Sequence, residues 1–278
     1  MERFNEPNSF PNFNFFKNTI SKISERFPFL HRIVLLHLLL LLICCIGILV
    51  DDRQLMGINV WIKPAKFILS TIIVLWTMAW YLLVYPFREK TKNFIAIFIA
   101  VLMMLENTLI TTQASRGVSS HYNQSNPLDG IAFGLMGIAI GLFTGVVFWF
   151  FVKSFSPQLK FSKRMKWCFR IAWFTFLFAS VIGGQMIGQM GHNIGVTDGG
   201  AGLPFLNWST VGGDLRVAHF FGIHGIQIIP LAAFYFAKKT RNNNTLTTVL
   251  SIGFALLYLG WIAFTFYQAK QGIPLLSL

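Results

Sequence analysis

The chain has 278 residues, of which 54% are hydrophobic and only 12% are charged. A soluble protein typically carries about 25% charged residues, so this composition excludes an ordinary soluble domain. The three cysteines, Cys44, Cys45 and Cys168, are too few and too scattered for a disulfide framework or a thiolate metal site.

The net charge of +13 is concentrated in four segments, 1–32, 87–93, 153–170 and 238–244. They hold 17 of the 23 Lys and Arg residues and four of the ten acids, so their basic excess equals the whole net charge. Basic connections of this kind mark the cytoplasmic side of a multi-pass membrane protein. The pattern predicts a cytoplasmic N-terminus and an outside C-terminus. It leaves no basic surface that would indicate a nucleic-acid partner.

Seven apolar runs of membrane-spanning length follow one another along the chain. Before them, residues 1–28 form a polar cytoplasmic tail without a cleavable signal peptide, and we expect it to be disordered or to lie at the lipid headgroups. Residues 29–278 form the membrane domain, so the predicted fold class is an all-α polytopic transmembrane bundle in a lipid bilayer. The spans are predicted at 33–50, 66–86, 94–114, 131–152, 168–190, 216–237 and 246–268.

The three connections predicted to lie outside, 51–67, 115–130 and 191–216, contain the unusual residues. The last is long and carries seven glycines, which disfavours regular structure and is typical of a functional or disordered loop. The spans that precede His121 and His192 look faintly alike, but the match predicts no internal repeat.

Polar residues recur at helical spacing in the outer halves of three spans. Glu106 and His224 are expected at similar depth, about 10–15 Å below the outer surface, where a carboxylate is costly and indicates an interior site. The pattern predicts an outward-facing pocket that the last outer connection covers, with Asp214 capping the sixth span. The expected site residues are Glu106 and Arg116 as catalytic groups, His121, His192, His219 and His224 as cofactor ligands, and Gln113, Gln185, Gln189, Asp214, Arg216 and Gln227 as pocket lining.

The leading functional hypothesis is a membrane oxidoreductase that binds haem b or a transition metal. Imidazoles on adjoining helices suit axial ligation, and the nearby Glu, Gln and Arg side chains suit protons or a quinone. His219 and His224 are about 140° apart around a helix, so they cannot both face one metal. One of them would have to pair with His121 or His192.

Two alternatives remain open. A transporter for a small solute or a proton fits the intramembrane Glu106, although the polar residues occur only in the outer half and the inner halves of the spans look sealed. A non-catalytic assembly or sensory protein would use the outer loops as a partner surface. A retinal protein is excluded because the last span, 246–268, has no lysine.

Three segments carry a family resemblance: "RGVSSHYN" (116–123), "GLPFLNWST" (202–210) and "GDLRVAHFFGIHGIQ" (213–227). Together they resemble the signatures of an uncharacterised bacterial family of multi-pass inner-membrane proteins, over roughly residues 55–235. The resemblance implies the inner membrane of a bacterium and implies nothing about the substrate.

Overall fold

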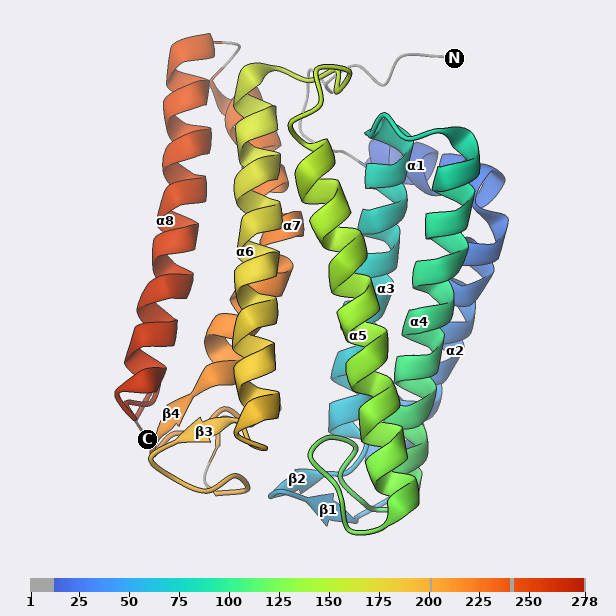
Figure 1. Ribbon diagram of the computed structural model, residues 1–278, viewed down its shortest axis with the longest axis vertical. Coiled ribbons are helices and arrows are strands. Elements are labelled where there is room, and N and C mark those ends of the chain that lie inside the picture. Colours follow the sequence, from blue (N-terminus) through green and yellow to red (C-terminus); the bar gives the residue numbers. More distant parts are fainter. Residues whose placement is uncertain (1–12, 201, 241–242, 278) are drawn as a thin grey trace.

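The computed structural model describes residues 13–200, 202–240 and 243–277. Within these residues, seven helices are long and apolar enough to cross a membrane. This confirms the predicted all-α polytopic bundle (Figure 1). The seven are α2 (Pro28–Val50), α3 (Ile62–Val84), α4 (Glu89–Ser115), α5 (Pro127–Lys153), α6 (Lys163–Gly188), α7 (Leu215–Lys239) and α8 (Asn244–Lys270).

Most of the helices begin several residues before the apolar runs from which the spans were predicted. Their first turns also include polar and proline residues. Both α2 and α5 begin at a proline, whose missing N–H is not needed in the first turn. The Asn126 side chain caps α5 by accepting from the backbone N–H of Asp129.

A further helix, α1 (Phe13–Arg26), lies within the tail predicted for residues 1–28. Arg26 at its end donates a hydrogen bond to Asn93 at 3.0 Å and pairs with Glu89, both on α4, and Ile23 is buried. This part of the tail is therefore helical and packed on the bundle. The prediction for residues 1–12 lies outside the described residues.

The connections alternate between two ends of the bundle (Figure 1). One end, here the basic end, holds α1 and the α3–α4, α5–α6 and α7–α8 connections. The other, here the loop end, holds the α2–α3, α4–α5 and α6–α7 connections and the C-terminus. The sequence had grouped the connections into the same two sets.

Two small antiparallel strand pairs lie at the loop end. In the α2–α3 connection, β1 (Gln54–Leu55) pairs with β2 (Ile58–Asn59). In the α6–α7 connection, β3 (Asn193–Ile194) pairs with β4 (Gly213–Asp214) and encloses the glycine-rich segment. This loop therefore has anchored ends despite its glycine content.

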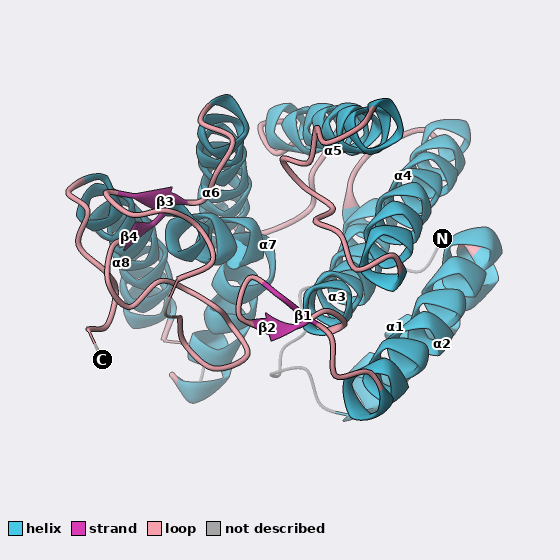
Figure 2. Ribbon diagram, turned by 90° about the horizontal axis from the view of Figure 1, so that it is seen from below, coloured by secondary structure: helices cyan, strands magenta, loops and turns pink. Residues whose placement is uncertain are grey.

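The spans form two groups of three helices, α2–α4 and α6–α8, here called the first and second halves (Figure 2). Helix α5 packs against α4 on one side and α6 on the other, and so links the halves. Between them α3 faces α7, as the 2.9 Å hydrogen bond from the Tyr81 hydroxyl to the Ile226 carbonyl shows.

The basic-end part of the interface between the halves is filled by aromatic side chains, here called the aromatic cluster. Trp173 of α6 is fully buried, and its indole N–H donates to the Tyr85 hydroxyl at 2.7 Å. Edge-to-face and tilted ring contacts tie the members together. The cluster consists of Trp80, Tyr81, Tyr85, Phe150, Phe169, Trp173 and Phe234.

Candidate functional site

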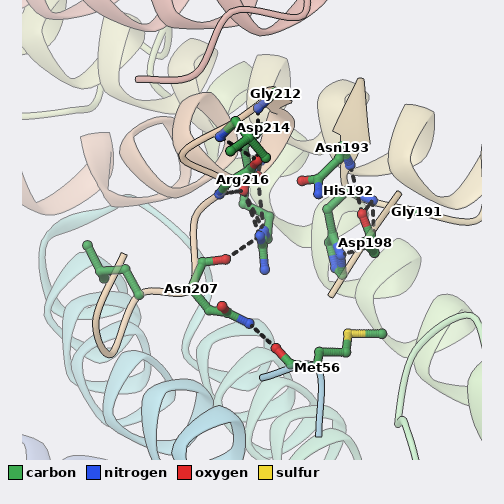
Figure 3. Close-up of polar contacts among 12 residues, drawn as sticks. Met56, Gly191, His192, Asn193, Asp198, Asn207, Gly212, Asp214 and Arg216 are labelled. Atoms are coloured by element: carbon green, nitrogen blue, oxygen red, sulfur yellow. Dashed lines mark hydrogen bonds and ion pairs between the residues drawn. The ribbon is translucent and has the colours of Figure 1, made fainter. Parts of the chain in front are cut away.

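The start of α7 organises the long loop at the loop end (Figure 3). Asp214 is 2% exposed and caps the helix, as predicted, by accepting from the backbone N–H of Arg216 at 2.9 Å. Its carboxylate also accepts from the backbone N–H of Ser209 and from the Arg216 guanidinium. Arg216 donates in turn to the Asn207 carbonyl. These contacts fix a basic side chain at the second position of α7.

His192 is held by Asp198 within the same loop (Figure 3). Its Nδ1 lies 2.6 Å from Oδ2 of Asp198, and the same carboxylate accepts the backbone N–H groups of His192 and Asn193. Burial opposes ionisation of Asp198, but the hydrogen bond and charge of His192 and the backbone donors lower its pKa to about 2. Burial also lowers the pKa of His192, and the hydrogen bond that its imidazole donates to Asp198 opposes this shift. His192 therefore directs its Nδ1–H at a carboxylate.

His121 lies close to His192, on the α4–α5 connection. Burial, followed by the positive charges of Lys63, His192 and His219, holds the pKa of His121 well below its usual range. Its ring contacts Phe67, and its Nδ1 lies 3.0 Å from the Ser120 hydroxyl. His121, His192 and His219 thus share one electrostatic environment at the loop end, and uncharged imidazoles are favoured there.

Tyr122 joins His121 to His192. Its ring centroid is 5.0 Å from that of His192 and 6.0 Å from that of His121. Burial raises the pKa of Tyr122 to about 12, helped by the Asp198 charge and opposed by Arg216. The phenol is therefore neutral and serves as a packing group between the two loops.

His219 and His224 point in different directions, as their spacing predicts. His219 donates from Nδ1 to the Ala179 carbonyl of α6 at 2.8 Å. His224 instead meets α3, where its Nε2 lies 3.2 Å from the Ser70 hydroxyl. His219 belongs with the loop histidines, whereas His224 contributes to the contact between the two halves.

Gln113 and Arg116 lie in a different place from the histidines. The Gln113 amide donates to Asp129 at 2.8 Å, and the Arg116 guanidinium pairs with the same carboxylate. Asp129 is 1% exposed and also accepts from the Asn126 amide at 2.7 Å. The network ties the end of α4 to the start of α5, which is a structural role.

The other three glutamines vary in their surroundings. Gln189 is exposed and donates to the carbonyls of Gly191 and Asn193, so it supports the loop. Gln185 is half-buried on α6. Gln227 is 9% exposed, and both polar atoms of its side chain are buried without a hydrogen bond.

Glu106 and Lys63 are two oppositely charged side chains that lack hydrogen bonds to the described residues. Glu106 of α4 is 6% exposed, and its Oε2 atom has no hydrogen-bond partner. Lys63, half-buried in the first turn of α3, has its ammonium 6.0 Å from the Phe67 ring centre and makes no hydrogen bond within the described part of the chain. No ion pair joins the two described side chains.

Sequence reasoning missed Lys63 and Asp198. A lysine near a helix end ordinarily reaches the interface by snorkelling, so the sequence gives no sign that Lys63 differs. The structure instead places it in the fields of Glu106, Asp198 and Arg216. Asp198 stands in a glycine-rich segment with no spacing signal, and only its contact with His192 reveals it.

The fit of these residues to a metal or haem is limited. Across the described ranges, no three His, Cys, Asp or Glu side chains are grouped so that they could hold a metal ion. The pocket next to His192, also lined by Met56, Asp198, Asn207 and Arg216, has room for about one water molecule. That pocket is too small for a haem macrocycle.

Seven spanning helices and a polar centre at one end define the chain as a multi-pass α-helical membrane protein. Comparison with protein-family models, with curated protein sequences and with solved structures gives no match.

Proposed function

We propose that the protein binds a small polar solute between its two halves and carries it across the membrane. The observation that supports this most strongly is the separation of Glu106 from Lys63, because a buried carboxyl without a partner in a membrane span marks a solute or ion pathway by default. Lys63 and Glu106 belong to the first half, and α3 contacts α7 of the second half through Ser70 and Tyr81. Movement of one half against the other would therefore change access to the place.

The two ends of the interface support transport by alternating access. The aromatic cluster closes the basic end around the fully buried Trp173, whereas the loop end contains charged and imidazole groups. We place the basic end in the cytoplasm because short basic connections face that side. The loop end and the C-terminus then face outward. The resemblance noted above supports the inner membrane of a bacterium.

Cysteine labelling tests this function. In a chain whose Cys44, Cys45 and Cys168 are replaced by alanine, Ser70→Cys should react with a membrane-impermeant maleimide added from the loop end. The matched variant Ala172→Cys, buried in the basic-end half, should not react from either side. Failure of Ser70→Cys to react from the loop end would contradict a site that opens there.

A metal-dependent oxidoreductase is the second candidate, and one observation favours it. Nδ1 of His121, His192 and His219 is held by Ser120, Asp198 and Ala179, respectively. The structure gives their Nε2 atoms no hydrogen bond among described residues. Imidazoles fixed through one nitrogen and free at the other are the usual form of metal ligands. The side chains would have to draw together to bind an ion.

Metal analysis and an optical spectrum, recorded before and after dithionite, test the second candidate. Stoichiometric metal or a Soret band that is lost in His219→Ala would support it and would favour a transition metal or haem b, respectively. Purified protein without either signal, even after reconstitution with zinc, iron or haem, would contradict it.

A further inference from the structure

The starts of α3 and α7 match in sequence. Residues 62–67 read IKPAKF and residues 215–220 read LRVAHF. Each stretch has an aliphatic residue, a basic residue, a variable position, alanine, a lysine or histidine, and phenylalanine. Each also begins its helix at the loop end, at Ile62 and Leu215. The match places Lys63 and Arg216 at equivalent positions.

The ends of α4 and α8 also match. Residues 113–118 read QASRGV and residues 268–273 read QAKQGI. Gly117 and Gly272 have the same φ of 73°. Their N–H groups bond the alanine carbonyls at 2.9 and 3.0 Å, and the next residue in each case bonds the glutamine carbonyl at 3.1 and 3.2 Å. The two helices end in the same left-handed glycine cap.

The strand pairs and the helix packing follow the same correspondence. Gly57 after β1 and Gly195 after β3 have φ of 78° and 83°, and each strand pair precedes the matching helix, α3 or α7. In both halves the first and second helices pack most closely and the first and third least. The glycine-rich segment is thus an insertion into the second copy of the hairpin.

Each unit crosses the membrane three times, and this odd number explains why the chain contains α5. A unit of three helices starts at one end of the bundle and finishes at the other, so a fourth helix is needed to return the chain before a second unit can repeat the orientation of the first. Helix α5 does this (Figure 1). These correspondences favour an internal repeat, which the faint likeness between the spans before His121 and His192 did not predict. In secondary transporters built from repeats, solutes bind at the interface between the repeats.

We infer that the chain is a duplicated three-helix unit, and that the equivalent residues Lys63 and Arg216, with Glu106 of the first unit, bind a small zwitterionic solute. This inference rests on the proposed function, because the zwitterion would occupy the solute site proposed there. Its anionic group lies between the two basic residues, and its ammonium group meets the Glu106 carboxyl.

The charges at the site favour a solute that carries both signs. Lys63 makes no hydrogen bond to the described residues, whereas Arg216 is already directed toward Asp214 and Asn207. An anion beside Lys63 would give its ammonium the partner that it lacks. An anion alone would leave the Glu106 oxygen without a partner, and a cation alone would add to the positive charge. A zwitterion provides the missing contact for each group.

Thermal unfolding of the full chain in detergent tests the inference with matched probes. Glycine, L-alanine, L-serine and L-proline are compared with acetate, propionate, methylamine and ethylamine. At least one amino acid should raise the melting temperature more than any of the single-charge probes. Lys63→Met and Glu106→Gln should each weaken its binding by at least about ten-fold. The control Glu89→Gln, on the same helix at the basic end, should not.

Two outcomes would overturn the inference. If acetate or propionate stabilises the protein as well as the amino acids and Glu106→Gln leaves this unchanged, the site takes a simple anion, and the solute-binding function stands without the zwitterion. If no probe shifts the melting temperature, water occupies the gap. Labelling of Ser70→Cys from the loop end then decides separately whether a solute site opens there.

Discussion

The two ends of the interface between the halves are built in opposite ways. At the basic end, the Trp173 indole and the Tyr81 hydroxyl are buried and hydrogen-bonded, and the surrounding rings are in contact. At the loop end, Glu106 is equally buried but its Oε2 has no partner, and the Lys63 ammonium remains apart from it. The basic end is closely packed, although the Trp80 indole N–H there also lacks a hydrogen bond, whereas the loop end leaves two groups of opposite charge without partners among the described residues.

This contrast is the ground for placing the proposed site at the loop end. Buried polar groups are normally hydrogen-bonded, and an unpaired group costs free energy. Such a group persists where a ligand, ion or water supplies the missing contact. Variants at the basic end should therefore change stability, whereas variants at the Lys63–Glu106 gap should change binding.

The largest effect on stability is expected for Trp173→Ala. Removing this fully buried indole leaves a cavity within the aromatic cluster, and the free energy of unfolding should fall by about 3–5 kcal/mol. Denaturant unfolding in mixed micelles measures the change. The control Phe148→Ala removes a ring that is 55% exposed toward the lipid and should have little effect. Equal losses in the two variants would contradict a structural core at the basic end.

The next largest loss of unfolding free energy is expected at the two glycine caps, one in each half. Gly117→Ala and Gly272→Ala each place a Cβ in a left-handed backbone conformation, which costs about 1–2 kcal/mol. Because the two caps are equivalent, the losses in unfolding free energy should agree. Gly145→Ala in the middle of α5, where a Cβ meets open space, should be neutral or stabilising. Clearly unequal losses at the two caps would weaken the case for a duplicated unit.

Tyr81→Phe should have a smaller effect at the basic end. It removes one buried hydrogen bond, to the Ile226 carbonyl, and keeps the ring contacts, so a loss of about 1 kcal/mol is expected. The same unfolding measurement detects it. Solute binding should be unchanged, and a strong loss of binding would move the functional site toward the aromatic cluster.

Glu106→Gln should have the smallest effect on stability. The substitution replaces an unpaired buried carboxyl with a neutral group of similar size, so the melting temperature of the solute-free protein should stay the same or rise. A large fall in melting temperature would show that Glu106 is structural.

Much of the fold follows from the sequence because apolar length and basic connections are strong, local signals. The Asp214 cap and the divergence of His219 from His224 were predictable for the same reason, since each depends on one helix. The partnership of Gln113 and Arg116 with Asp129 was not, because it depends on how the α4–α5 connection folds back. Helical spacing alone had placed both residues with the histidines.

The internal repeat was hidden by the chemistry of membrane spans. In the interior of a span many apolar residues are interchangeable, so the similarity survives only at helix starts and caps, such as those around Lys63, Arg216, Gly117 and Gly272. The glycine-rich insertion between β3 and β4 separates the matching segments further. Equivalent φ angles and hydrogen bonds make the relation visible.

In the proposed function, Lys63 and Glu106 are held apart for a solute. An experimental density map that resolves ordered solvent, obtained with the stabilising amino acid present, tests it most directly. The account predicts non-protein density that bridges the Lys63 ammonium, the Arg216 guanidinium and the Glu106 carboxyl. A direct ion pair between Lys63 and Glu106, with no density between the halves, would contradict it.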